Sequence, residues 1–176
     1  DVLSYWRFTH EMPLEKALEM VQGYAKSQDK NSICAKRLKR HVSIANKLRR
    51  FEGMKLKNMQ DIGGCRAILS SVKKLRQVER ELKKKPEFRI RDGLPKYKDY
   101  IKEPKDDGYR SLHLIGKFPD VYGTSKYVEV QLRTVTQHYW ATALEIVDLF
   151  TKQSLKTNQG QDVWKSFFID MGAIFE

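Results

Sequence analysis

Residues 128–133 alternate strictly between apolar and polar side chains and are followed by Thr134, and no other feature constrains the fold of this chain as strongly. Residues 128–134 read Val-Glu-Val-Gln-Leu-Arg-Thr. Successive side chains of a β-strand point to opposite faces, so one face can be buried while Glu129, Gln131 and Arg133 share the other. The segment therefore predicts a half-buried strand that directs a carboxylate, an amide and a guanidinium at a single site.

Helix signals lie on both sides of this strand. Thr134 and Gln137 have capping-box spacing, so a helix is expected to begin there and run to about Phe150, with Trp140 and Phe150 among the residues packed on the sheet. Other helices are expected from Pro13 to about Val21, over 43–51 with Phe51 on its apolar face, from Ser71 to Pro86, and over 163–174.

Apolar runs predict further strands over 65–69, 88–91, 111–118 and 126–132, with Gly63-Gly64 in a turn before the first. The order of elements favours an α+β fold (α/β layers), in which helices flank a mixed sheet of about four or five strands. We expect a single domain over residues 1–176, and the abrupt ends favour a fragment of a longer chain.

The chain is strongly basic, with 34 Lys and Arg against 22 Asp and Glu and a net charge of +12. Such an excess attracts nucleic acid, nucleoside polyphosphates or anionic membrane surfaces, although it also fits a surface that serves only solubility. Cys34 and Cys65 lack histidine neighbours at metal-ligand spacing. With no signal peptide and no apolar run that could span a bilayer, we expect a reducing cytoplasmic location and no membrane partner.

Residues 96–113 combine cations, aromatic rings and a glycine turn. This composition suits a phosphorylated molecule that contains a base. Tyr109 offers a flat face worth roughly 1–3 kcal/mol per stacked base. His113 follows four residues later, on the same predicted strand face, although a lone strand histidine is more often structural. The segment also supplies three point charges, Lys96, Lys98 and Lys105.

Two acids are candidates for one metal site. If the strands beside Asp61 and Glu129 are neighbours, the two carboxylates converge as Mg²⁺ requires, since this ion takes few protein oxygens. Taken alone, Asp61 before two glycines is more simply a turn former. A basic block around Ser43 contains Arg37, Lys39 and Lys47 and can hold a triphosphate, although a solvated helix face is the simpler interpretation.

At these residues the chain resembles the synthetase domain of the RelA/SpoT family, the pyrophosphokinases that make (p)ppGpp alarmones. Five motifs occur in the family's order and together span about residues 35 to 145. A chance match to all five is very improbable. The motifs are Arg37-x-Lys39 with Ser43-Ile44-x-x-Lys47, Asp61-Ile62-x-Gly64-x-Arg66, Tyr97-Lys98-Asp99-Tyr100-Ile101, Pro104-Lys105-x-x-Gly108-Tyr109-Arg110-Ser111-Leu112-His113, and Glu129-Val130-Gln131-Leu132-Arg133-Thr134.

The resemblance implies a nucleotidyltransferase-like fold and Mg²⁺-dependent transfer of the β,γ-diphosphate of ATP to a ribose 3′-hydroxyl. It implies that Asp61 and Glu129 bind the metal, that Glu129 also activates the hydroxyl, and that Tyr109 stacks on the acceptor base. The implied ATP-binding residues are Arg37, Lys39, Ser43, Lys47 and Arg66. The implied acceptor-binding residues are Lys96, Lys98, Lys105, Tyr109, His113, Gln131 and Arg133.

The chain departs from the family's pattern at several places. Asp106-Asp107-Gly108 stands where many relatives have Asn-Gly, and residues 137–146 lack the Glu-His pair typical of small alarmone synthetases. With Gln153-Ser154-Leu155-Lys156 and the helix carrying Trp164, Phe167 and Phe168, this resembles the toxic subclass. Those toxins pyrophosphorylate the 3′-terminal adenosine of tRNA, and some have a fused or separate antitoxin.

Three functions follow as alternatives. The extra acid and the basic surface favour the tRNA 3′ end as the acceptor, with (p)ppGpp synthesis from GDP or GTP as the main alternative. A catalytically silent RNA- or nucleotide-binding module is the third, and the presence of both Asp61 and Glu129 argues against it. No histidine-aspartate hydrolase region precedes the motifs, so alarmone hydrolysis is not expected.

Overall fold

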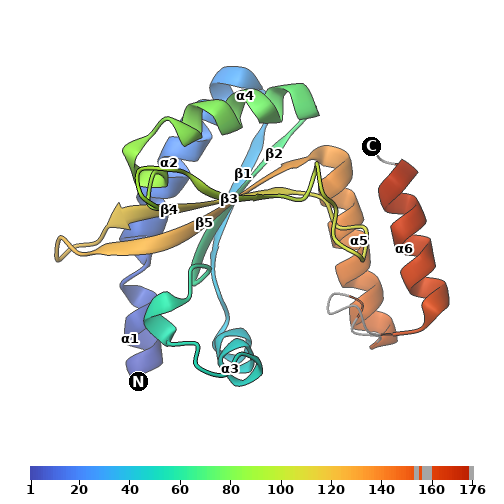
Figure 1. Cartoon of the computed structure of the whole chain (residues 1–176), viewed down its shortest axis with the longest axis horizontal. Coiled ribbons are helices and arrows are strands. Elements are labelled where there is room, and N and C mark those ends of the chain that lie inside the picture. Colours follow the sequence, from blue (N-terminus) through green and yellow to red (C-terminus); the bar gives the residue numbers. More distant parts are fainter. Residues whose placement is uncertain (153–154, 156–159, 175–176) are drawn as a thin grey trace.

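A single five-stranded sheet organises the computed structural model, which describes residues 1–152, 155 and 160–174 (Figure 1). The strand order is β1-β2-β5-β4-β3. Strands β2 and β5 pair in parallel and the other neighbours are antiparallel, so the predicted mixed sheet is confirmed. The strands are β1 (Ile33–Leu38), β2 (Gly63–Leu69), β3 (Lys96–Asp99), β4 (Leu112–Pro119) and β5 (Ser125–Thr134).

The helices lie mainly on one face and at one end of this sheet. Helices α2 and α4 cover one face, whereas α5 and α6 lie side by side at the far end (Figure 1). In the described part of the chain, no helix is long and apolar enough to cross a membrane. The helices are α1 (Val2–Phe8), α2 (Glu11–Gln28), α3 (His41–Arg50), α4 (Val72–Lys83), α5 (Val135–Thr151) and α6 (Asp162–Ile174), with 3₁₀ turns η1 (Leu56–Asn58) and η2 (Pro86–Phe88).

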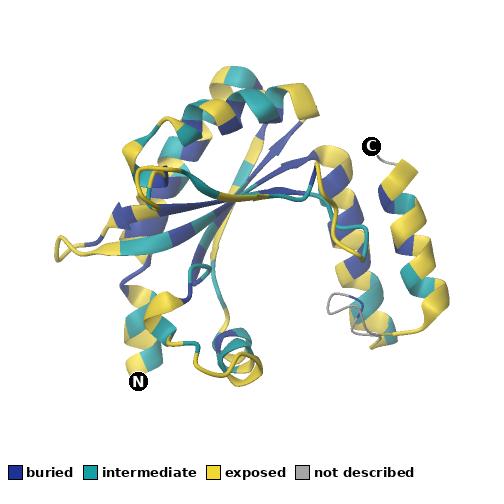
Figure 2. Ribbon diagram, viewed as in Figure 1, coloured by how far each residue is buried: buried dark blue, intermediate teal, exposed yellow. Residues whose placement is uncertain are grey.

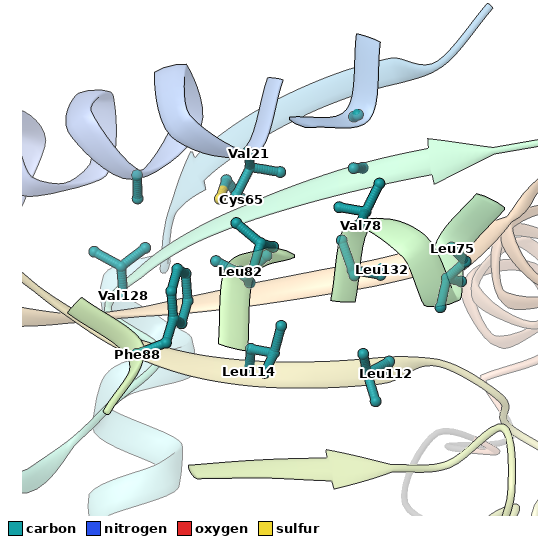
Figure 3. Close-up of a cluster of buried hydrophobic side chains, with 14 of the residues drawn as sticks. Val21, Cys65, Leu75, Val78, Leu82, Phe88, Leu112, Leu114, Val128 and Leu132 are labelled. Atoms are coloured by element: carbon teal, nitrogen blue, oxygen red, sulfur yellow. The ribbon is translucent and has the colours of Figure 1, made fainter. Parts of the chain in front are cut away.

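The main core fills the space between the sheet and helices α2 and α4. The apolar side chains of β5, including Val128 and Leu132, point into it and meet Leu82 and Phe88 (Figure 3). The central strands β2, β4 and β5 are the most deeply buried part of the sheet, and the outer faces of the helices are exposed (Figure 2). Because side chains alternate along a strand, the polar residues of β5 must point to the opposite face.

The predicted capping box between β5 and α5 is present. Thr134 Oγ1 accepts from the Gln137 backbone N–H at 3.2 Å, and Gln137 Oε1 accepts from the Thr134 N–H at 3.0 Å. The predicted packing of Trp140 and Phe150 of α5 on the sheet is wrong. Trp140 belongs to a second cluster with Phe168 of α6, whereas Phe150 is 81% exposed.

Three further expectations are corrected by the structure. Residues 88–91 form no strand, because Pro86 starts η2 and Phe88 is buried as a single anchor against the core. Gly63-Gly64 is the start of β2 rather than a turn. Phe51 caps α3 and is about half exposed, so it does not share the buried face of that helix.

We predict opposite effects of the same substitution at two glycines. An added Cβ at Gly116 in β4 would lie 2.6 Å from Phe118 Cε2 and 3.0 Å from Phe88 Cε1, so Gly116→Ala should destabilise the fold by about 1–3 kcal/mol. Gly23 is exposed on α2 with open space around it, so Gly23→Ala should stabilise by about 0.5–1 kcal/mol. Urea unfolding of both variants measures the two signs, and a stabilising Gly116→Ala would contradict the packing described.

Candidate active site

Two rows of residues cross the sheet face opposite α2 and α4. In the first row, Gln131 of β5 lies beside Arg66 of β2 on one side and His113 of β4 on the other, and His113 pairs with Lys98 of β3. Paired residues of neighbouring strands point to the same face. Strand pairing therefore gathers four polar side chains from four distant segments.

The second row crosses the sheet two residues away and contains Glu129. Glu129 pairs with Gly64 of β2, and Gly64 pairs with Arg37 of the edge strand β1. On the other side, Ile115 separates Glu129 from Lys96 of β3. Because Gly64 has no side chain, space remains between the guanidinium of Arg37 and the carboxylate of Glu129.

The Glu129 carboxylate is partly buried and held at both oxygens. His113 Nδ1 lies 3.1 Å from Oε1, and Gln131 Nε2 donates to Oε2 at 2.9 Å. Burial opposes ionisation, but the interactions with His113 and Gln131 outweigh it and lower the pKa of Glu129 to about 2. Glu129 is therefore ionised throughout the neutral range.

Asp61 precedes β2 and is bracketed by two lysines. Lys39, which follows β1, donates to Oδ2 at 2.8 Å, and Lys47 of α3 donates to Oδ1 at 2.9 Å. Burial opposes ionisation of Asp61, but these two ammonium groups prevail and hold its pKa below the usual range. The predicted triphosphate-binding lysines and the predicted metal-binding acid are thus already in contact.

Two cavities meet at the two acids. The larger has a volume of about 520 Å³ and is lined by Lys47 and by Lys96 and Lys98 of β3, among others. The smaller has a volume of about 260 Å³. The residues that line the smaller cavity and were predicted from the sequence as site residues include Arg37, Lys39, Arg66, Tyr109, Gln131 and Arg133. Four residues line both cavities, namely Asp61, Lys105, His113 and Glu129.

Tyr109 lies just before β4, in the segment 100–111 that we call the acceptor loop after the role that the sequence predicts for it. It therefore does not share a strand face with His113, contrary to the sequence prediction. Its hydroxyl accepts from Arg133 Nη2 at 2.6 Å and lies 2.8 Å from His113 Nε2. With the proton on Nδ1, His113 accepts from Tyr109 and donates to Glu129, so one hydrogen-bonded chain runs from Arg133 to Glu129. Burial raises the pKa of Tyr109.

The ring of Tyr109 lies among cations. Lys105 Nζ is 4.8 Å and Arg133 Cζ is 5.0 Å from its centroid. Lys105 is exposed and also approaches the ring of Tyr100, at 4.8 Å from its centroid, so its ammonium group is shared between two aromatic rings.

Gln131 organises two arginines in the smaller cavity. Its Oε1 accepts from Arg66 Nε at 3.3 Å and from Arg133 Nη2 at 3.1 Å. Burial and the neighbouring Arg133 lower the pKa of Arg66. Arg133 is 6% exposed, and its Nε has no hydrogen-bond partner among the described residues. This concentration of positive charge is suited to an anion.

Some residues differ from the sequence prediction. Ser43 lies on α3 one turn before Lys47 but does not line either cavity. Glu145 and Trp140 of α5 line the smaller cavity, although neither was predicted to be a site residue. The available signal was helical spacing. Ala141 and Glu145 of α5 are four residues apart and therefore share the helix face that lines the smaller cavity.

The donor chemistry fits Mg²⁺. Within residues 1–152, 155 and 160–174, no three His, Cys, Asp or Glu side chains form a metal cage. Mg²⁺ is instead usually held by one or two carboxylates together with substrate phosphates and water. Asp61 and Glu129, both with lowered pKa values and both at the junction of the cavities, match that requirement.

Comparisons with known proteins agree with this geometry. A family profile described as "Region found in RelA / SpoT proteins" matches residues 36–147. The chain is 38% identical over 115 residues to the GTP pyrophosphokinase YwaC of Bacillus subtilis, a match covering 60% of this chain and 52% of YwaC. It is 31% identical over 147 residues to the GTP pyrophosphokinase YjbM of the same organism, covering 80% of this chain and 68% of YjbM. The chain thus spans about half the length of the first relative.

Solved structures share the fold. Small alarmone synthetase 1 from Bacillus subtilis, bound to its product pppGpp, superimposes with a TM-score of 0.80 at 24% identity and covers 98% of this chain and 91% of its own. The Type VI effector Tas1, in complex with its immunity protein, is a more distant match, with a TM-score of 0.55 at 15% identity over 74% of this chain and 60% of its own. The predicted α+β fold is confirmed.

We predict that the stabilising contribution of Glu129 depends on pH in the acid range. Its pKa falls from 4.5 to about 2 on folding, so the stabilisation is complete above pH 4.5 and is lost as the pH falls toward 2. Glu129→Gln should lower the free energy of unfolding by on the order of 1–3 kcal/mol at pH 7. Urea titrations at decreasing pH should show this difference shrinking below pH 4.5, and a constant difference would contradict the assigned contacts.

Proposed function

Because the chain belongs to the RelA/SpoT family, we propose that it is a Mg²⁺-dependent pyrophosphokinase that transfers the β,γ-diphosphate of ATP to the ribose 3′-hydroxyl of GDP or GTP. The observation that carries this proposal is the meeting of two cation-lined cavities at Asp61 and Glu129. A transfer between two nucleotides requires two adjoining sites with charge-stabilising groups at their junction.

The donor phosphates belong beside Asp61 in this proposal. Lys39 and Lys47 already provide two ammonium groups there, and Arg37 and Arg66 line the smaller cavity, which Asp61 also lines. Phosphate oxygens are stronger competitors for these lysines than a single carboxylate, which frees Asp61 oxygens as metal ligands. When bound by Asp61 and Glu129, Mg²⁺ would neutralise charge on the transferred diphosphate.

The acceptor belongs on the side of β3 and the acceptor loop. Lys96 and Lys98 supply charges for its 5′-phosphates, and Lys105 reaches both cavities. Tyr109 provides a ring for the base, while its hydroxyl is fixed by Arg133 and His113. The ribose then lies near Glu129, which is connected to Tyr109 through His113.

The reaction joins the acceptor 3′-oxygen to the β-phosphorus of ATP and breaks the bond between that phosphorus and the oxygen bridging to the α-phosphorus, so AMP leaves. A carboxylate with a pKa of about 2 is a weak base for a ribose hydroxyl. Glu129 therefore acts first by accepting a hydrogen bond that orients the hydroxyl, and it takes the proton as the new oxygen–phosphorus bond forms. Such a transition state needs mainly positioning and charge neutralisation.

GDP or GTP is better supported as the acceptor than the tRNA 3′ end that the sequence favoured. Both matched curated relatives are GTP pyrophosphokinases. The extra acid is also partly committed within the acceptor loop, because Asp107 Oδ1 accepts from the Tyr109 backbone N–H at 2.9 Å. Among the residues invoked for the toxic subclass, Gln153, Ser154 and Lys156 lie outside the described residues. The Tas1 match shows the fold alone.

An acceptor assay tests this proposal. The protein is incubated with Mg²⁺ and γ-labelled ATP, together with GDP, GTP or deacylated tRNA, and the labelled products are separated. Label should appear in guanosine tetra- and pentaphosphate. Label in tRNA alone would overturn the assigned acceptor and restore the toxin interpretation with its antitoxin, and label in neither product would overturn pyrophosphokinase activity.

We predict that two substitutions at Tyr109 separate stacking from hydrogen bonding. Tyr109→Ala removes the ring, so the KM for the acceptor should rise about tenfold or more while the KM for ATP stays within about twofold. Tyr109→Phe keeps the ring but removes the hydroxyl contacts to His113 and Arg133, so it should lower kcat with a smaller effect on the acceptor KM. Equal rises in both KM values for Tyr109→Ala would remove the stacking role.

A further inference from the structure

Helix α6 packs against the backbone of the acceptor loop through a pair of glycines. An added Cβ at Gly172 of α6 would lie 2.7 Å from the Gly108 carbonyl oxygen. An added Cβ at Gly108 would lie 2.9 Å from the Phe168 carbonyl oxygen, and Gly108 also has a φ of +86°. Backbone contact this close admits only hydrogen at both positions.

Three side-chain hydrogen bonds surround this contact: one joins the loop to α6, one lies within the loop, and one joins α5 to α6. Arg110 Nε donates to the carbonyl oxygen of Gly172 at 3.1 Å, and Arg110 Nη1 donates to that of Ile101 at 3.2 Å. Trp140 Nε1 donates to the Phe168 carbonyl at 2.8 Å. Gly172 lies in the last turn of α6, where carbonyls lack intrahelical donors, so Arg110 satisfies one of them from the loop.

The other side of the same loop faces the cavities. Lys105 and Tyr109 line the smaller cavity and lie on either side of Gly108. The backbone between them is closed by two hydrogen bonds, from Gly108 N–H to Lys105 O at 2.8 Å and from Lys105 N–H to Tyr109 O at 3.2 Å. A displacement of Gly108 must therefore move Lys105 and Tyr109 together.

We propose that α6 is a positioning element for acceptor binding, with Gly172 and Arg110 as its contact residues. It holds the acceptor loop from behind, so that Tyr109 and Lys105 stay in the lining of the smaller cavity, while no described residue of α6 lines either cavity itself. The identity of the nucleotide that the loop binds rests on the proposed function, whereas the contact between α6 and the loop does not. Loss of the contact should impair acceptor binding selectively.

The test combines amide hydrogen exchange with steady-state kinetics on Gly172→Ala. Amides of the loop, including those of Lys105, Gly108 and Tyr109, are hydrogen-bonded and should exchange about tenfold faster in the variant without nucleotides. The KM for GDP or GTP should rise about tenfold, with the KM for ATP within about twofold. Gly23→Ala is the matched control, since its Cβ meets open space and both quantities should stay as in the wild type.

A second variant guards against misfolding of the first. Arg110→Met removes the hydrogen bonds donated to the carbonyls of Gly172 and Ile101 and keeps an unbranched apolar stem, so it should show the same pattern in weaker form. Unchanged loop exchange in both variants would overturn the contact, and faster exchange with an unchanged acceptor KM would overturn its role in binding. If the wild type transfers diphosphate to no acceptor, the proposed function fails, and the exchange measurement still decides whether α6 holds the loop.

Discussion

The alternation of side chains along β5 is the constraint on which the rest of the site depends. Its apolar residues are buried beneath α2 and α4, which forces Glu129, Gln131 and Arg133 onto the opposite face. A shift of one residue in register would bury these polar groups and empty the site. The parallel partner β2 then brings Asp61 to the same junction, and the antiparallel partner β4 supplies His113.

The parts of the fold that could be predicted are those with local signals. The capping box fixed the start of α5, and the alternating strands β4 and β5 were predicted within about two residues. Strands β1 and β3 were not predicted, because they are edge strands with many charged residues and depend on pairing with a neighbour. The predicted strand over 88–91 was wrong because Phe88 is buried in the main core from a 3₁₀ turn and belongs to no strand.

The same distinction applies to the site. Sequence motifs identified most of the charged side chains that line the two cavities, but they could not show that His113 joins Tyr109 to Glu129. They also could not reveal the role of α6, since Gly108 and Gly172 are distant in sequence and meet only after packing. Long-range backbone contact leaves no local pattern in the chain.

The central claim is that Asp61 and Glu129 bind one shared metal ion. Calorimetric titration with Mn²⁺ in place of Mg²⁺, in the presence of a non-hydrolysable ATP analogue, tests it on the wild type, Asp61→Asn, Glu129→Gln and the double variant. Each single substitution should weaken Mn²⁺ binding about tenfold or more, and the double variant should lose much less than the product of the two effects. Wild-type affinity in either single variant, or fully multiplicative losses, would contradict the claim.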